Sequence, residues 1–185
     1  MFYIDTKVCF LIGMLLYVYF LHSWKKQNVP LKKIIWFSLL YLYVLLLISV
    51  TFFPVELLFG QEKILGQWSL FGFWDDMQHY IARDMYLVPI RQIGGNLILL
   101  SPLGFLLPMI YWSPKKFANA FGIGFAVAFG IEFLQLFLTI LLPGRYRVFD
   151  VDDLWLNTLG FVIGFCLYEI FVWLFPKISQ KIKPE

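Results

Sequence analysis

Five long apolar segments constrain the fold of this chain more than any other feature of its sequence. They cover residues 8–22, 34–53, 92–112, 117–142 and 154–175. A helix needs about 20 residues to cross the hydrocarbon of a bilayer, and the last four segments reach that length. The first segment is shorter, but Ile4 and Trp24 extend it at the interface. The pattern predicts five transmembrane helices.

The composition excludes an ordinary soluble domain. Of the 185 residues, 61% are hydrophobic and only 15% are charged, which is more apolar surface than a soluble core of this size can bury. No repeat or long linker separates a second domain, so residues 1–185 are expected to form one all-α membrane domain. The first segment lacks a basic flank and a small-residue cleavage site before Lys25, which favours a retained span.

Lysines gather in alternate loops between these segments. The loop after the first segment holds Lys25, Lys26, Lys32 and Lys33, the loop after the third holds Lys115 and Lys116, and the chain after the fifth holds Lys177, Lys181 and Lys183. Cytoplasmic loops concentrate basic residues. We therefore expect the N-terminus outside and the C-terminus in the cytoplasm. The net charge of +3 reflects this topology and indicates no nucleic-acid partner.

The longest connection, residues 54–90, contains an amphipathic pattern. One side of the pattern carries Phe73, Trp74, Met77, Tyr80, Ile81 and Met85, and the other carries Asp75, Asp76, His79 and Arg83. This spacing predicts a helix lying in the outer membrane interface between the second and third spans. A re-entrant hairpin is the alternative. Either element would cover the polar residues at the outer ends of the spans.

Polar residues cluster toward the outer ends of the last three spans. They are Asn96, Glu132, Gln135, Arg147, Asp150, Asp153 and Asn157. Burying such groups near hydrocarbon is costly unless they meet one another or water. We therefore expect them to converge, with Asp150, Asp152 and Asp153 also placed to cap the last helix.

Small residues predict which helix faces pack together. Residues 117–142 carry two stripes with a spacing of four, namely Ala120, Gly124 and Ala128, and Ala118, Gly122, Ala126 and Gly130. The last span carries Gly160 and Gly164. Small residues let transmembrane helices approach closely, so these faces are expected to pack. Glu132 continues the first stripe, and Asn157 shares the face of Gly160, so both side chains should point inward.

Three segments together resemble the VanZ family. The first is Asn96 followed by Pro-Leu-Gly at 102–104, the second is Glu132-Phe-Leu-Gln135, and the third is the Arg, Asp, Asp, Asn, Gly series at 147, 150, 153, 157 and 160. The three occur in the family's order within residues 86–164. Arg147 fits the spacing better than Arg145, which would share its role or contact a lipid phosphate.

The resemblance implies a small multi-pass protein of the Gram-positive plasma membrane. It also implies a role in resistance to teicoplanin, a lipoglycopeptide that binds the cell-wall precursor lipid II. The family has no established reaction. The expected partners are membrane lipids, with lipid II or the lipoglycopeptide as candidate ligands. Cofactors, metals and oligomeric state stay open.

The polar cluster admits four interpretations. As a binding site, Asn96, Gln135, Arg145, Arg147 and Asn157 would hold an anionic head group or limit access of the drug. As an enzyme acting on a phosphate-bearing lipid or a cell-wall precursor, it would use Glu132 as general acid or base, with Asp150 and Asp153 holding a divalent cation. The cluster could instead serve only to bridge helices, in a structural partner of cell-wall enzymes. Transport ranks last. Binding requires less of the site than catalysis does, so it is the preferred interpretation.

Overall fold

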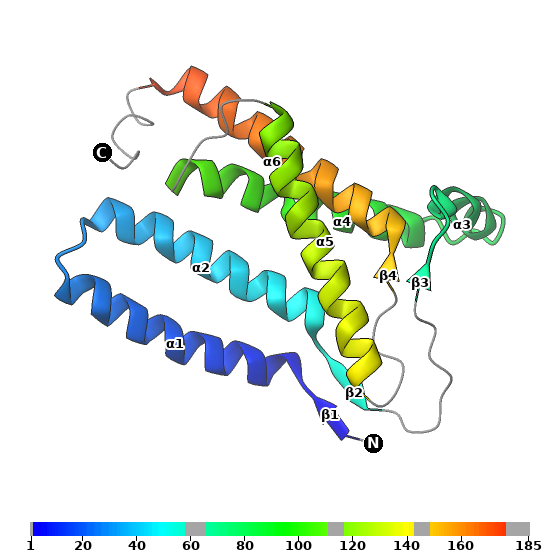
Figure 1. The fold of residues 1–185 in the computed structure, drawn as a ribbon, viewed down its shortest axis with the longest axis horizontal. Helices are drawn as coiled ribbons and strands as arrows, with labels where there is room; N and C mark the ends of the chain where they lie inside the picture. The colour runs from blue at the N-terminus through cyan, green and yellow to red at the C-terminus, as the bar shows by residue number, and fades with distance from the viewer. Residues whose placement is uncertain (1, 58–65, 111–116, 143–148, 177–185) are drawn as a thin grey trace.

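Helices dominate the computed structural model, which describes residues 2–57, 66–110, 117–142 and 149–176. Within these ranges lie six helices, α1 (Thr6–Lys26), α2 (Leu31–Phe52), α3 (Gly72–Ile81), α4 (Leu87–Ile110), α5 (Phe117–Leu141) and α6 (Val151–Leu174) (Figure 1). All except α3 are long and apolar enough to cross a bilayer. The predicted fold of five spans is confirmed.

The ends of the helices follow local capping rules. Asp5 caps α1, because its carboxylate accepts the Lys7 N–H at 3.1 Å.

The third span, α4, begins at Leu87, five residues before its predicted start. Pro89 is compatible with this earlier start, since N–H groups in the first turn of a helix have no helical acceptor.

Two small sheets, which the sequence analysis did not predict, tie loops together at one end of the molecule. Strand β1 (Phe2–Ile4) pairs antiparallel with β2 (Val55–Leu57), joining the start of the chain to the end of α2. Strand β3 (Gly66–Gln67) pairs parallel with β4 (Phe149–Asp150), joining the segment before α3 to the start of α6. Both sheets lie at the same end as α3 (Figure 1).

Helices α4 and α6 touch through their backbones. A Cβ atom added at Gly164 would lie 1.8 Å from the Ser101 carbonyl oxygen, and one added at Gly160 would lie 2.1 Å from the Leu97 carbonyl oxygen. Phe161, between these glycines, is buried. The predicted role of Gly160 and Gly164 in close packing is confirmed, and this contact forms the centre of the bundle.

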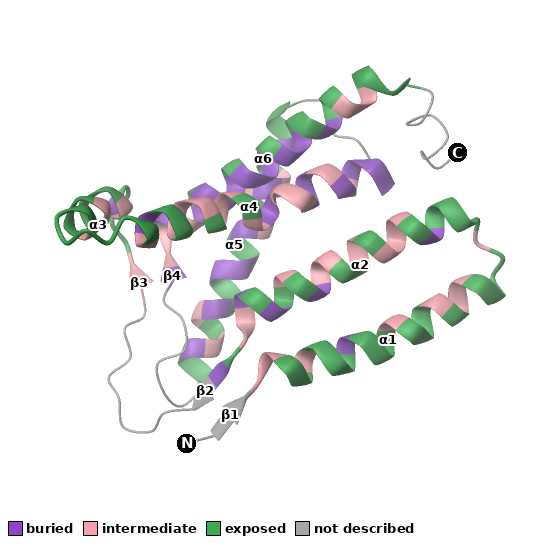
Figure 2. Cartoon of the chain, turned by 180° about the vertical axis from the view of Figure 1, so that it is seen from behind, coloured by how far each residue is buried: buried purple, intermediate pink, exposed green. Residues whose placement is uncertain are grey.

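Helix α5 crosses this pair and uses only one of its two small-residue stripes. The stripe of Ala120, Gly124 and Ala128 is buried, with Gly124 against Phe161. The other stripe is wrong as a packing face, because Ala118, Gly122, Ala126 and Gly130 are exposed. The stripes are offset by two residues, or about 200° around a helix, so they face opposite ways. Buried and exposed bands alternate along α5 in Figure 2.

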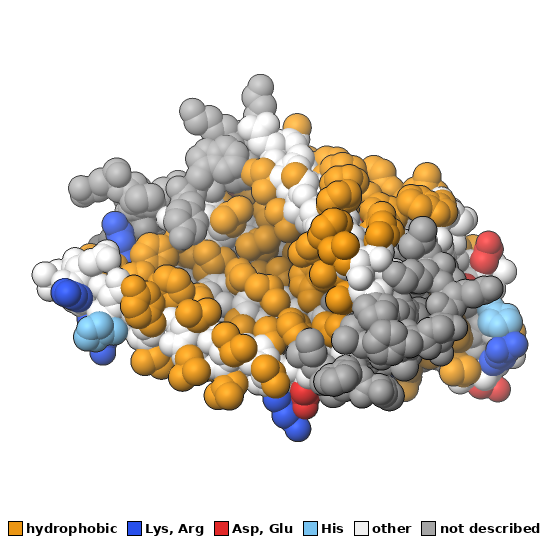
Figure 3. Space-filling model, turned by 60° about the horizontal axis from the view of Figure 1, so that its bottom comes forward, with side chains coloured by type: hydrophobic (Ala, Val, Ile, Leu, Met, Phe, Trp, Pro, Cys, Tyr) orange, Lys and Arg blue, Asp and Glu red, His pale blue; other side chains and the backbone are white. Residues whose placement is uncertain are grey.

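Helix α1 lies at the edge of the bundle beside α2. Gly13 is its one buried residue, and its carbonyl accepts the Tyr41 hydroxyl at 2.8 Å. Hydrophobic side chains cover most of the described surface on the face shown in Figure 3. Such a surface suits contact with lipid. The helix predicted within residues 54–90 is present as α3, while its depth in the membrane and the orientation of the chain stay predictions.

Candidate functional site

Five of the predicted site residues line one cavity. Its volume is about 160 Å³, and the described lining comes from α2, α4, α5 and α6. We call this cavity the polar cavity. The predicted residues in its lining are Asn96, Glu132, Gln135, Asp153 and Asn157. Their convergence follows from helix packing, since α5 and α6 both turn their small-residue faces inward.

Glu132 is the most enclosed charged residue of the polar cavity. Its side chain is only 2% exposed, and Oε2 accepts the backbone N–H of Asp150 at 3.1 Å. Asp150 thus joins the site through its backbone. Its own carboxylate accepts the Asp152 N–H at 2.8 Å and caps α6, as predicted.

Burial changes the acidity of Asp150, which lies just before α6. Burial is the largest influence and raises the pKa of the Asp150 carboxyl, and the charges of Asp152 and Asp76 raise it further. Backbone hydrogen bonds from Asp152 and Asp153 act against this rise. The net effect is a carboxyl that holds its proton to higher pH than an exposed aspartate.

Two side-chain amides bridge neighbouring helices around the polar cavity. The Asn96 Nδ2 donates to Asp153 Oδ1, which links α4 to α6. The Gln135 Nε2 donates to the Thr51 carbonyl oxygen at 3.1 Å, which links α5 to the last turn of α2. These bridges fix the positions of the four helices around the cavity.

Two buried oxygens in the lining lack a hydrogen-bond partner among the described residues. They are Asn157 Oδ1 and Thr51 Oγ1, on side chains whose residues are 1% and 4% exposed. Buried polar atoms are normally paired, so each such exception needs an explanation. Thr51 was not among the predicted site residues. A threonine in an apolar helix carries no sequence signal that separates this position from ordinary hydroxyls.

Asp152 has a role that the sequence analysis missed. Its carboxylate is buried and accepts the N–H groups of Phe71 at 2.7 Å and Phe73 at 2.8 Å. It therefore holds the start of α3 against the start of α6. The left-handed backbone of Phe71, with φ of 65°, turns both N–H groups toward one acceptor. Only capping of α6 was predicted for this residue.

Some predicted features lie beyond what the structure describes. Arg145 and Arg147 fall outside the described residues, so their assignment as ligand-binding residues stays a prediction. Within the described ranges, no three His, Cys, Asp or Glu side chains are grouped to hold a metal ion. The proposed catalytic roles of Glu132, Asp150 and Asp153 likewise stay predictions.

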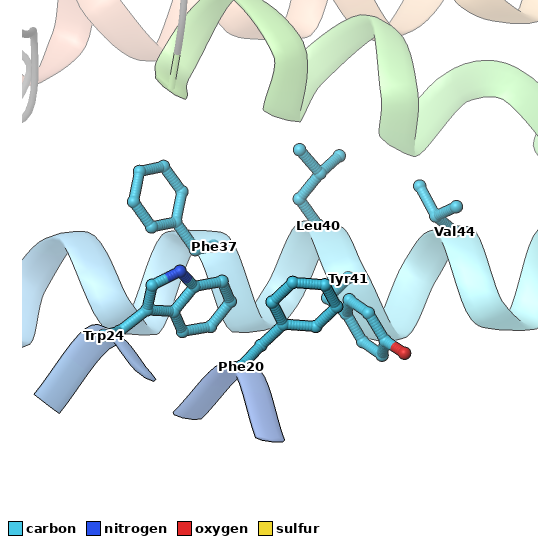
Figure 4. Close-up of a pocket in the computed structure, with 6 residues that line it drawn as sticks. All are labelled: Phe20, Trp24, Phe37, Leu40, Tyr41 and Val44. Carbon is cyan, nitrogen blue, oxygen red and sulfur yellow. The ribbon is translucent and has the colours of Figure 1, made fainter. Parts of the chain in front are cut away.

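A second cavity differs from the polar cavity in its chemistry. It has a volume of about 270 Å³ and is lined by Phe20, Trp24, Phe37, Leu40, Tyr41 and Val44 (Figure 4). Phe20 and Trp24 come from α1, and the others come from α2. Its aromatic and aliphatic lining suits hydrocarbon, so a polar head group would find few partners there.

Fold and site together define a multi-pass helical membrane protein with a buried polar cavity near one end of its bundle. A family model described as VanZ/LLP1 matches residues 37–172, from α2 to α6, and the chain belongs to this family. Searches of curated proteins and of solved structures found no match. The family match confirms the predicted resemblance and extends it to α2, which carries Thr51.

Proposed function

We propose that this protein contributes to teicoplanin resistance by binding the head group of a lipid-linked cell-envelope molecule in the polar cavity. The observation that carries this proposal is a pair of oxygens, Asn157 Oδ1 and Thr51 Oγ1, which have no hydrogen-bond partner among the described residues and belong to residues that line one cavity with two carboxylates. A cluster that served only to bridge helices would use its buried polar atoms within the protein. Unpaired atoms in residues that line a cavity are expected where a ligand completes the hydrogen bonds.

The volume of the cavity favours a head group over the drug itself. Pockets that enclose drug-sized ligands have volumes of roughly 300–1,000 Å³. The polar cavity, at about 160 Å³, is too small for a lipoglycopeptide and suits one polar group of a lipid. Resistance would then follow from holding or presenting a lipid-linked intermediate so that the drug reaches it less readily.

The distribution of charge supports an outward-facing cavity. Lys25 and Lys26 end α1, and Lys32 and Lys33 lie in the first turn of α2, at the end of the bundle remote from the two sheets (Figure 1). The polar cavity lies toward the other end, near the close of α2 and the start of α6. Since basic loops stay in the cytoplasm, this end would face outward, where lipid-linked cell-wall precursors are used.

Catalysis on a phosphate-bearing lipid is the second candidate. It is favoured by the burial of Glu132 beside the cavity, an environment in which carboxylates serve as general acids or bases. The two candidates differ in outcome. Incubation of the purified protein with lipid II and Mg²⁺ would give a mass change that disappears in Glu132→Gln if the protein is an enzyme, and saturable binding without product if it is a binder.

The proposal is tested by teicoplanin susceptibility of cells producing defined variants. Glu132→Gln and Asp153→Asn preserve size while removing charge, and Asp75→Asn on exposed α3 is the matched control. With membrane levels equal by immunoblot, the two cavity variants should fall to the susceptibility of cells without the protein, and the control should protect fully. Full protection by both cavity variants would refute the proposal.

A further inference from the structure

The hydroxyl of Thr51 differs in its hydrogen bonding from the other serine and threonine hydroxyls buried in the described spans. Ser49, Thr139 and Thr158 each donate to the carbonyl four residues earlier, at 2.7, 2.9 and 2.7 Å. This bond is the usual way to satisfy a helical hydroxyl in an apolar setting. Thr51 Oγ1 makes no such bond among the described residues, and Thr51 is one of the residues that line the polar cavity. Its hydroxyl can therefore both donate to and accept from a ligand.

The described lining holds a buried acceptor that receives no hydrogen bond from the described residues. Ionised carboxylates such as Glu132 and Asp153 only accept hydrogen bonds. Asn96 and Gln135 each donate one amide hydrogen to a protein oxygen, while Asn157 Oδ1 accepts no hydrogen bond from the described residues. A ligand that matches this lining must bring hydrogen-bond donors. An ionised phosphate brings acceptors alone, so it cannot donate a hydrogen bond to Asn157 Oδ1.

Ammonium groups and hydroxyl groups are two kinds of head group that bring hydrogen-bond donors, and Thr51 distinguishes between them. An ammonium group donates but cannot accept, so it would leave the proton of the Thr51 hydroxyl unused. A ligand hydroxyl both donates and accepts, and it satisfies Thr51 and Asn157 together. The volume of about 160 Å³ corresponds to about five waters at roughly 30 Å³ each, which is the scale of a sugar ring or glycerol.

We propose that the polar cavity binds the uncharged, hydroxyl-bearing head group of a glycolipid or a glycosylated lipid intermediate. Thr51 and Asn157 contact its hydroxyls directly, and Glu132 and Asp153 accept further hydrogen bonds from it. This inference rests on the proposed function and names the class of head group that the site takes. It makes Thr51 a specificity-determining residue.

Native mass spectrometry in lipid nanodiscs tests the inference. The full-length protein is placed in phosphatidylcholine containing equal amounts of monoglucosyl diacylglycerol, phosphatidylethanolamine and phosphatidic acid. The wild type should retain the glucosyl lipid in preference to the others. Thr51→Val and Asn157→Leu should abolish that preference. Thr158→Val is the matched control, because its buried hydroxyl is paired with Leu154, and it should keep the preference.

Thermal stability supplies a readout that a purely structural role would not give. In pure phosphatidylcholine, Thr51→Val should unfold at the same or a higher temperature than the wild type, since it removes an unpaired buried hydroxyl. Thr158→Val should unfold at a lower temperature. Lower stability in both variants, with unchanged glucosyl-lipid retention, would overturn the inference.

Retention of the other lipids in the nanodisc experiment also tests the inference. Preferential retention of phosphatidylethanolamine or phosphatidic acid, or of none of the three, overturns the choice of a hydroxyl-bearing head group. If phosphatidic acid is retained and Glu132→Gln abolishes teicoplanin protection, the proposed function stands and only this inference fails. If Glu132→Gln and Asp153→Asn both protect fully, the proposed function fails whichever lipid is retained.

Discussion

Adding one methyl group at Gly164 tests the contact on which the arrangement of the polar cavity depends. In Gly164→Ala, the new Cβ would lie 1.8 Å from the Ser101 carbonyl oxygen, whereas ordinary contacts begin near 3.4 Å. Helices α4 and α6 would have to separate by about 1.6 Å at this point, because backbone on both sides leaves no flexible side chain to yield. Asn96 on α4 would then move away from Asp153 on α6.

The expected cost follows from measured overpacking. Extra atoms in a tight core typically cost about 1–3 kcal/mol, and a clash with backbone belongs at the upper end of that range. For a chain of this length, about 3 kcal/mol lowers the unfolding temperature by roughly 6–12 °C. Thermal unfolding of the purified protein in one detergent measures this shift.

The matched control is Gly122→Ala on α5. An added Cβ there meets no atom within 4 Å, so replacing a helical glycine with alanine should stabilise the protein by about 0.5–1 kcal/mol. The two variants make the same chemical change and should shift the unfolding temperature in opposite directions. Equal unfolding temperatures for Gly164→Ala and Gly122→Ala would refute the close contact between α4 and α6.

Three further predictions follow from the loops around the site. Asp152→Ala removes the acceptor that holds the start of α3, so the amides of residues 71–81 should exchange hydrogen faster, while rates unchanged from the wild type would contradict this role. Burial raises the pKa of the Asp150 carboxyl in the folded state. The protonated carboxyl therefore stabilises the fold fully at pH values below its ordinary pKa, and this stabilisation is lost as the pH rises through the raised pKa. Asp150→Asn keeps a capping oxygen but cannot ionise. As the pH rises between the ordinary and the raised pKa, the unfolding temperature of the wild type should fall relative to that of this variant, and a constant difference between the two would contradict the raised pKa. In intact cells, an impermeant thiol reagent should label Asp75→Cys and spare Lys25→Cys, and the reverse pattern would invert the topology.

The spans and most of the polar cavity could be predicted from the sequence because strong physical costs govern them. The lengths of the apolar segments predicted the five spans, with errors of a few residues at ends where the helix continues into charged residues or proline. The cost of burying Glu132 and Asn157 required them to face inward, and small residues on the same faces indicated the direction. These arguments predicted that seven polar residues converge, and five of the seven line one cavity in the structure.

The remaining features depend on tertiary contacts that periodicity does not encode. Thr51 is distinguished only by the absence of the bond that Thr158 makes, and that difference requires coordinates. The second stripe on α5 has the same spacing as the first, so spacing alone does not show which stripe packs, and in the structure Gly124 of the first stripe lies against Phe161 on α6. The attachment of α3 to Asp152 joins residues about 80 positions apart, beyond the reach of any local pattern.

An experimental structure in nanodiscs containing monoglucosyl diacylglycerol tests the central claim most directly. The account predicts head-group density within hydrogen-bond distance of both Thr51 Oγ1 and Asn157 Oδ1. The claim would be contradicted if the Thr51 hydroxyl instead donates to the Leu47 carbonyl, four residues earlier, and the polar cavity holds only water.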